Sequence, residues 1–160
     1  MTRRSLLASA IALGAGALAA IPRISGADSS EHYEVSYTPD QWKARLSAEQ
    51  YYVLREHGTE LAFSSPLDAE KRAGVYECAG CALPVFSSAA KFDSGTGWPS
   101  FWEPLPNAVL RSSGGSAFFG IEVHCRRCGG HLGHVFNDGP KPTGLRYCIN
   151  GVALRFIAKA

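Results

Sequence analysis

The sequence predicts a mainly β domain, built from antiparallel sheets, with short helices at its N-terminal side. Two observations predict this class: beyond residue 58, glycine and proline interrupt the chain every few residues, and the apolar stretches between them are short and often aromatic or β-branched. The length of 160 residues separately fits one domain able to bury a core without disulfides.

Helices are expected ahead of that point. Residues 38–40, Thr-Pro-Asp, predict a helix start with proline in the first turn, and this short helix continues through 42–46. Ser47 and Gln50 have the spacing of a capping box, which predicts a second helix over 48–56 that the following His-Gly pair ends. The clearest strands are expected at 74–78, 117–125, 144–149 and 152–157.

Charge argues against one class of partner. The formal net charge is +2, 19% of the residues are charged, and no run is rich in arginine or lysine. The chain therefore lacks the basic patch typical of nucleic-acid-binding proteins, and we expect no nucleic acid partner.

The first 27 residues are expected to form an export signal peptide. Arg3 and Arg4 precede an uncharged stretch of apolar and small residues, which resembles a bacterial twin-arginine signal. Small residues favour cleavage after Ala27, with Ala19 as a second candidate, and a disordered or membrane-anchoring tail is the alternative. This interpretation places the protein in the periplasm, or anchored on the outer side of the membrane if the signal stays uncleaved. Residues 28–37 would then form a flexible linker and 38–160 the folded domain.

Four of the five cysteines lie in two Cys-x-x-Cys pairs, Cys78/Cys81 and Cys125/Cys128. Each pair makes a tight turn that points two sulfurs at one centre, and two such turns supply the four thiolates of a tetrahedral zinc site. Four protein ligands leave no open coordination position, so the expected single zinc ion is structural. A pair of disulfides is the alternative in an exported protein, and a redox Cys-x-x-Cys is disfavoured because no βαβ pattern surrounds either pair.

The fifth cysteine, Cys148, lies in a predicted strand between Arg146 and Asn150. Alternation along a strand places these three side chains on one face. A nearby guanidinium favours the thiolate, which is the nucleophilic form of cysteine. Taken alone, a cysteine in an apolar strand is also typical of a small core residue.

The neighbouring motifs favour chemistry. His131, His134 and Asp138 lie within eight residues in an expected loop after the second cysteine pair, and histidine is the natural proton donor and acceptor near neutral pH. A second metal on the His-x-x-His spacing is an alternative that lacks a convincing third ligand. Trp98, flanked by glycine and proline, predicts an aromatic wall suited to a thioether methyl group, whereas the nearby aromatics at 101–102 are expected in the core.

Together these motifs resemble the B-type methionine sulfoxide reductases, which reduce the R epimer of methionine sulfoxide. The resemblance covers roughly residues 38 to 158. It rests on Gly58-Thr59-Glu60 with Phe63, on both cysteine pairs, on Lys91 through Gly95, on Gly97 through Phe101, on His131 through Pro140 and on Thr143 through Asn150.

The resemblance implies a fold and a mechanism. The fold is the zinc-bound, Mss4-like or β-tent structure of two antiparallel sheets. Cys148 attacks the sulfoxide sulfur, His131 or His134 protonates the departing oxygen, and Cys148 is left as a sulfenic acid. The remaining implied roles are methyl binding by Trp98, tuning and orientation by Arg146 and Asp138, and a hydrogen bond from Asn150.

Two departures from the family pattern stand out. Many members carry a resolving cysteine where this chain has Thr96, so we expect reduction of Cys148 by an external thiol or a thioredoxin-like protein. An arginine expected near Gly120 is also missing, which leaves the contacts of Glu122 open.

The sequence thus predicts a monomeric protein-repair enzyme that acts on methionine-R-sulfoxide in oxidised proteins or peptides. The main rival is a non-enzymatic, zinc-stapled β domain that binds a protein partner, which would leave Cys148, the histidines and Trp98 unexplained. A reductase for another oxidised thioether is a third hypothesis.

Overall fold

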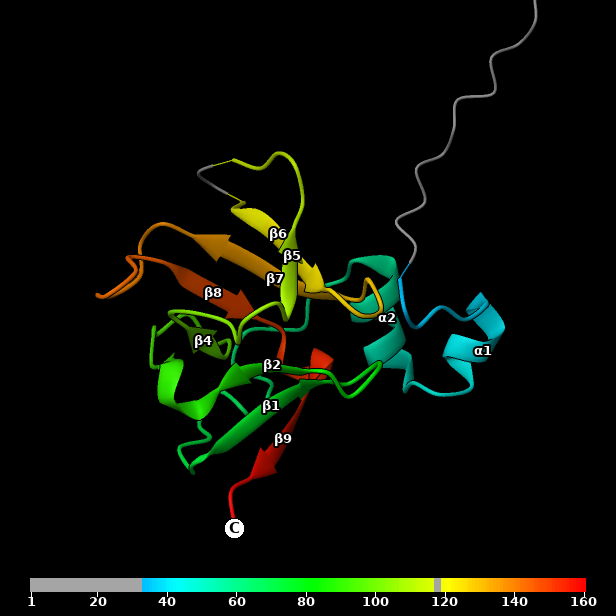
Figure 1. The fold of residues 1–160 in the computed structure, drawn as a ribbon, viewed down its shortest axis with the longest axis horizontal. Helices are drawn as coiled ribbons and strands as arrows, with labels where there is room; N and C mark the ends of the chain where they lie inside the picture. Colours follow the sequence, from blue (N-terminus) through cyan, green and yellow to red (C-terminus); the bar gives the residue numbers. More distant parts are fainter. Residues whose placement is uncertain (1–32, 117–118) are drawn as a thin grey trace, which may run out of the picture. The chain divides into compact units, whose positions relative to one another are not determined.

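A computed structural model describes residues 33–116 and 119–160 of the chain (Figure 1). The expected export signal and the first part of the expected linker lie outside the described residues. The rest of that linker contacts the domain, because the Val35 amide donates to the Arg127 carbonyl at 3.0 Å and Tyr37 packs edge-on against Trp42. Among the described residues no helix is both long and apolar enough to cross a membrane.

Two short helices open the described part of the chain, α1 (Pro39–Lys43) and α2 (Ala48–Glu56). Each begins with a capping box, in which a hydroxyl accepts from the N3 amide while the N3 glutamine side chain accepts from the cap amide. The bounds expected for α2 are confirmed. The expectation that the first helix reaches 46 is wrong, because the chain must become extended at Ser47 to cap α2.

The strands form two antiparallel sheets, as the sequence predicts (Figure 1). The smaller sheet has the order β2-β1-β9, with bounds Pro84–Ser87, Gly74–Cys78 and Leu154–Ala158. The larger has the order β3-β4-β8-β7-β6-β5, with bounds Lys91–Phe92, Ser100–Phe101, Arg146–Ile149, His131–Phe136, Ile121–Cys125 and Val109–Arg111. Short 3-10 turns at Ser88–Ala90 and Gly151–Ala153 connect neighbouring strands.

Most differences from the expected strands are shifts at the ends, but one is a change of type. The last strand starts at Leu154 because Gly151–Ala153 form a 3-10 turn. The expected histidine loop is wrong, because its residues form strand β7, hydrogen-bonded between β6 and β8. Short strands such as β3 and β4 carry too few residues to show a period in the sequence.

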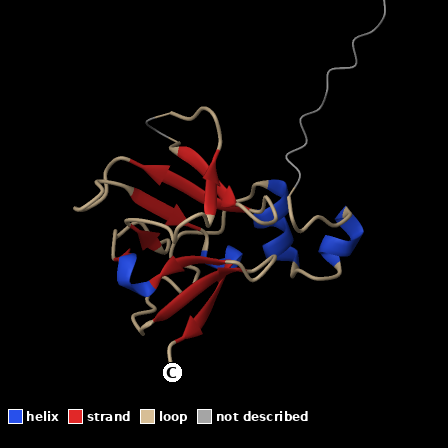
Figure 2. Cartoon of the chain, in the orientation of Figure 1, coloured by secondary structure: helices blue, strands red, loops and turns tan. Residues whose placement is uncertain are grey.

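Aromatic side chains join the two sheets into one core. Phe86 of the small sheet stacks on Phe101 of the large one, with ring centroids 4.4 Å apart, and Tyr76 meets Phe101 edge-on at 5.0 Å. Phe86, Phe101 and Tyr76 are fully buried, which confirms Phe101 as a core residue, whereas Trp102, also expected in the core, is only partly buried. Figure 2 shows the helices α1 and α2 to one side of the strands, where α2 packs against β7 of the large sheet.

Candidate active site and metal centre

The two Cys-x-x-Cys pairs meet although they come from different sheets. Cys78 ends β1 and Cys125 ends β6, and the second cysteine of each pair lies in the turn that follows. All four sulfurs lie within 4.8 Å of one another. The pairs thereby join the small sheet to the large one.

The sulfur separations test whether the site suits a metal. Cys78 Sγ lies 3.7 Å from Cys128 Sγ, and Cys81 Sγ lies 3.5 Å from Cys125 Sγ. Tetrahedral Zn–S bonds of about 2.3 Å separate sulfurs by roughly 3.8 Å, whereas a disulfide requires about 2.05 Å. The four free thiols therefore fit a tetrahedral metal ion and do not fit two disulfides.

Local turns explain how each pair points inward. The amide of Ala82 donates to the Cys78 carbonyl at 2.8 Å, and the amide of Gly129 donates to the Cys125 carbonyl at 2.8 Å. Both donors have a left-handed backbone, with φ of 57° at Ala82 and 65° at Gly129. Glycine is the natural residue at the second turn, because a Cβ there would come within 2.3 Å of the Tyr33 ring.

Cys148 belongs to a row of polar side chains that crosses the large sheet. It lies on β8 opposite Ser100 on β4 and opposite His134 on β7, and His134 in turn lies opposite Glu122 on β6. Directly paired residues share one face of a sheet. The register thus places a thiol, an imidazole and a carboxylate side by side.

A cavity of about 320 Å³ opens over Cys148. Its walls are mostly apolar, with a few polar groups, as is usual for small-molecule sites. Its lining consists of Thr59, Trp98, Phe119, Gly133, His134, Phe136, Cys148 and Asn150. Of the residues singled out in the sequence, Trp98, His134, Cys148 and Asn150 line the cavity, while His131, Arg146 and Asp138 lie outside its lining.

Burial controls the state of the thiol. It raises the pKa of Cys148 above its ordinary value, while the Thr96 hydroxyl and the Arg146 guanidinium act in the opposite direction. Thr96 Oγ1 lies 3.8 Å from Cys148 Sγ. The guanidinium favours the thiolate, as the sequence suggests, but burial outweighs it, and Cys148 rests as a thiol at neutral pH.

Arg146 is held by a two-point ion pair. Its Nε and Nη2 donate to the two carboxylate oxygens of Asp138 at 2.9 and 2.7 Å. The guanidinium also lies over the Phe136 ring, 4.3 Å from its centroid, and Phe136 lines the cavity. Asp138 therefore orients Arg146, and Arg146 packs against a wall of the site.

The two histidines of β7 differ in their surroundings. His134 lines the cavity, and burial lowers its pKa. His131 is only 2% exposed, and its Nδ1 lies 2.8 Å from Glu122 Oε1. Burial lowers the pKa of His131 as well, against the opposing effect of Glu122. Both imidazoles are therefore neutral at neutral pH in the free protein.

The contacts of Glu122, which the sequence leaves open, are now resolved. Its Oε1 accepts from Nδ1 of both His57 and His131 at 2.8 Å, and its Oε2 accepts from Ser112 at 2.9 Å. Burial alone would raise the pKa of Glu122, but these partners lower it to about 2. Glu122 is therefore an ionised carboxylate beside two imidazoles, a relationship between distant segments that carries no local sequence signal.

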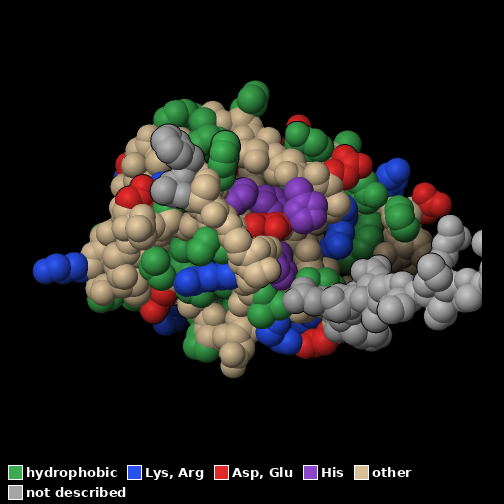
Figure 3. Space-filling view, turned by 90° about the horizontal axis from the view of Figure 1, so that it is seen from above, with side chains coloured by type: hydrophobic (Ala, Val, Ile, Leu, Met, Phe, Trp, Pro, Cys, Tyr) green, Lys and Arg blue, Asp and Glu red, His purple; other side chains and the backbone are tan. Residues whose placement is uncertain are grey.

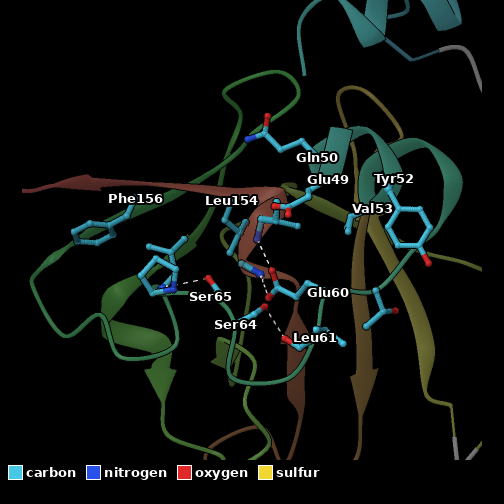
Figure 4. A pocket seen from close by; sticks show the side chains of 15 residues that line it. Glu49, Gln50, Tyr52, Val53, Glu60, Leu61, Ser64, Ser65, Leu154 and Phe156 are labelled. Atoms are coloured by element: carbon cyan, nitrogen blue, oxygen red, sulfur yellow. Dashed lines mark hydrogen bonds between the residues drawn. The ribbon is translucent and has the colours of Figure 1, made fainter. Parts of the chain in front are cut away.

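Glu60 is a second residue whose part in the site was not foreseen, although it lies in the Gly58-Thr59-Glu60 motif. Its carboxylate accepts from the amides of Gly151 and Val152 at 2.6 and 2.8 Å (Figure 4). Its own amide donates to Asn150 Oδ1 at 3.0 Å, and its carbonyl accepts from Trp98 Nε1 at 3.2 Å. Glu60 thus ties two cavity-lining residues to the turn that follows β8.

A row of hydroxyls leads away from the thiol. Ser94 Oγ lies 2.8 Å from Thr96 Oγ1 and 2.7 Å from Ser100 Oγ. The Ser100 hydroxyl in turn donates to the Trp98 carbonyl at 3.1 Å. These bonds fix the glycine-flanked loop that carries Trp98 against β4.

Comparison with known proteins identifies the family. Residues 46–158 match the SelR domain. The chain is 49% identical over 127 residues to a peptide methionine sulfoxide reductase MsrB of Leptospira interrogans, an alignment that covers 78% of this chain and 97% of that protein. It is 53% identical over 124 residues to the MsrB of Thiobacillus denitrificans, with 76% of this chain and 94% of that protein covered. The MsrB of Methanosarcina barkeri is 52% identical over 124 residues, with 76% and 87% covered. The chain therefore belongs to the MsrB family of SelR-domain peptide methionine sulfoxide reductases and is an oxidoreductase that acts on methionine sulfoxide.

Proposed function

We propose that this protein reduces the R epimer of methionine sulfoxide in oxidised proteins or peptides, with Cys148 as the nucleophile. The observation that carries this proposal is the meeting of Cys148, His134 and Trp98 around one cavity of about 320 Å³. A thiol, a proton carrier and an apolar wall are the groups that reduction of a methyl sulfoxide requires.

The first step joins Cys148 Sγ to the sulfoxide sulfur. His134 takes the thiol proton and delivers it to the sulfoxide oxygen, because this oxygen leaves poorly as an anion. The sulfoxide S–O bond and the new S–S bond then break as the protonated oxygen bonds to Cys148 Sγ. Cys148 is left as a sulfenic acid and the thioether departs, so thiol plus sulfoxide gives sulfenic acid plus methionine. His134 is preferred to His131 as the proton carrier because it lines the cavity and lies opposite Cys148.

Trp98 and Asn150 place the substrate in this proposal. The indole offers an apolar face to the methyl group, and its Nε1–H is already bonded to Glu60. Asn150 uses its Oδ1 for Glu60 and one Nδ2 hydrogen for the Leu132 carbonyl. The second hydrogen of that amide is available to the sulfoxide oxygen.

Arg146 and Asp138 act through Cys148 rather than on the substrate. The guanidinium lowers the pKa of Cys148 relative to a site without it, so it promotes loss of the thiol proton. Asp138 holds the guanidinium in place through its two-point ion pair.

The four paired cysteines would hold one structural zinc ion. Their sulfur separations suit tetrahedral coordination, and four thiolates complete the coordination of zinc, so the ion takes no part in the reaction. When bound it supplies a clamp between the two sheets.

Regeneration of Cys148 is proposed to use an external thiol. The other cysteines are gathered at the metal centre, and Thr96 occupies the position next to the Cys148 sulfur. Two equivalents of a thiol, or one thioredoxin-like dithiol, would reduce the sulfenic acid to the thiol and release water.

We further propose export to the periplasm on the strength of the Arg3-Arg4 signal. Mass spectrometry of the protein recovered from an expressing bacterium tests this proposal. A mature N-terminus near residue 28 in the periplasmic fraction supports it, and an intact N-terminus in the cytoplasmic fraction contradicts it.

The decisive experiment for the reaction is a single-turnover assay of the reduced, zinc-loaded protein with separated R and S epimers of a methionine sulfoxide peptide. We expect about one methionine per protein from the R epimer only, and none from Cys148→Ser. Turnover of the S epimer, or full activity of the variant, would overturn the proposal. The free amino acid sulfoxide, assayed alongside, tests the preference for peptides.

A further inference from the structure

Three potential metal ligands converge in a second cluster that includes none of the four paired cysteines. His57 ends α2, Glu122 lies on β6, and His131 lies on β7. Their ligand atoms, two imidazole nitrogens and a carboxylate oxygen, all lie within 4.8 Å of one another. Figure 3 shows histidine side chains gathered around an acidic group on this face.

We propose that His57, Glu122 and His131 form a second metal site that binds a divalent transition-metal ion such as Zn²⁺. Two imidazoles and one carboxylate are the protein donors of zinc sites that keep an open fourth position for water. Nitrogen and oxygen donors distinguish this site from the all-sulfur centre.

The geometry needs only a small adjustment to accept an ion. Each Nδ1 lies 2.8 Å from the same carboxylate oxygen, whereas tetrahedral ligands at about 2.0–2.1 Å from zinc lie roughly 3.3 Å apart. A withdrawal of the ligands by roughly 0.5 Å opens the space. The His57 side chain is 64% exposed and can make this movement, and it also gives the ion access from solvent.

Contacts beyond the three ligand atoms hold the Glu122 carboxylate and the buried His131 imidazole in position to bind an ion. Ser112 donates to the second Glu122 oxygen at 2.9 Å, a bond of the kind that orients metal-bound carboxylates. His131 is fixed by burial, with its side chain 2% exposed. Coordination through Nδ1 requires the imidazole proton on Nε2. That atom of His131 is buried without a hydrogen-bond partner in either tautomer, so the change of tautomer leaves no additional group unpaired.

Metal binding is tested on the full chain with zinc already on the four cysteines and with Cys148→Ser, which removes the remaining thiol. Titration calorimetry with Zn²⁺ should detect one further ion per protein. Co²⁺ in its place should give visible d–d absorption without added thiolate-to-metal charge transfer. His57→Asn should weaken this binding by at least about tenfold, as should Glu122→Gln.

Asparagine is the suitable replacement for His57 because it tolerates the left-handed backbone there, where φ is 57°. Glu56→Gln, which changes an exposed neighbouring acid, is the matched control and should bind the second ion as tightly as the parent. No second ion, or equal affinity in His57→Asn, would overturn the site. Circular dichroism verifies that each variant is folded.

Discussion

Cys148 and His134 lie directly opposite each other on the neighbouring antiparallel strands β8 and β7, and both line one cavity. Antiparallel pairing fixes such a pair on the same face of a sheet with short separation between the Cβ atoms. His131, three residues earlier, is instead buried and bonded to Glu122. The register of β7 therefore separates two histidines that the sequence presents as equivalent.

This difference predicts unequal effects of replacing the two histidines. His134→Gln should slow sulfenic acid formation by about 10²- to 10⁴-fold, because in the proposed mechanism the departing oxygen loses its proton donor. His131→Gln should slow it much less, since that ring lies outside the cavity lining. Single-turnover reactions with the R-epimer peptide, quenched at successive times at neutral pH, give both rates. A larger loss in His131→Gln, with both variants folded, would reverse the assignment.

The position of Thr96 predicts that a cysteine in its place would form a disulfide with Cys148. Its Oγ1 lies 3.8 Å from Cys148 Sγ, so a sulfur placed there is within rotamer reach of disulfide formation. Thr96→Cys should form an internal disulfide with Cys148 after one turnover, seen as loss of two free thiols with zinc bound. Thr96→Ser, the matched control, should retain a sulfenic acid on Cys148 that a dimedone probe traps. Trapping of equal sulfenic acid in Thr96→Cys would contradict this geometry.

Sequence patterns captured what is encoded by near neighbours. The capping box of Ser47 and Gln50 predicted the bounds of α2, and the Cys-x-x-Cys spacing predicted the two turns that each point a pair of sulfurs at one centre. Each depends on residues within one or two turns of chain, where spacing translates directly into geometry.

Pairing between distant strands escaped prediction. The His57 and Glu122 side chains are 65 residues apart, and Glu60 reaches Val152 across 92 residues. Strand β7 reads as a loop because Gly133 and its flanking histidines show no apolar alternation, and its partners β6 and β8 supply the hydrogen bonds that make it a strand. Such contacts depend on register, which single-sequence periodicity does not specify.

The hydrogen bonds of Glu60 predict that replacing this residue weakens both the fold and substrate binding. Glu60→Gln keeps the side-chain shape but exchanges one acceptor oxygen for a donor that faces the amide of Gly151 or Val152. The unpaired amide should cost about 1–3 kcal/mol of unfolding free energy, measured by urea denaturation. Because Glu60 also holds Trp98 and Asn150, KM should rise more than kcat falls.

The control for this variant is Glu103→Gln, which changes an exposed acid that lies outside both helices and outside the cavity over Cys148. It should change neither quantity. An unchanged KM in Glu60→Gln, despite the loss of stability, would show that Glu60 supports the fold but not the substrate wall.

The raised pKa of Cys148 predicts a particular pH dependence of its reactivity. Burial favours the neutral thiol, so the rate of alkylation by iodoacetamide should keep rising with pH beyond the midpoint of an ordinary thiol. Arg146→Met should move the midpoint higher still, because Arg146 lowers the pKa. Lys159→Met, a control with the same change of charge, should leave it unmoved. A lower midpoint in Arg146→Met would contradict the proposed tuning role.

Removal of the metal should disrupt the fold, and activity should be lost with it. Cys78 and Cys125 end strands of different sheets. Without the ion, the cysteine sulfurs would remain crowded together, and no metal–sulfur bonds would join the two sheets. Structural zinc contributes apparent binding energies of about 10–16 kcal/mol in small domains, comparable with the whole unfolding free energy of about 5–15 kcal/mol of a globular protein. Chelation, or Cys81→Ser, should therefore lower the melting temperature strongly and abolish near-ultraviolet circular dichroism, with activity lost in parallel.

The control is Cys148→Ser. This variant should lose activity while its zinc content and melting temperature stay unchanged, because the sulfur of Cys148 lies in the cavity and outside the metal cluster. A metal-free protein that melted at the same temperature as the loaded one would show that the aromatic core formed by Phe86 and Phe101 holds the sheets together on its own.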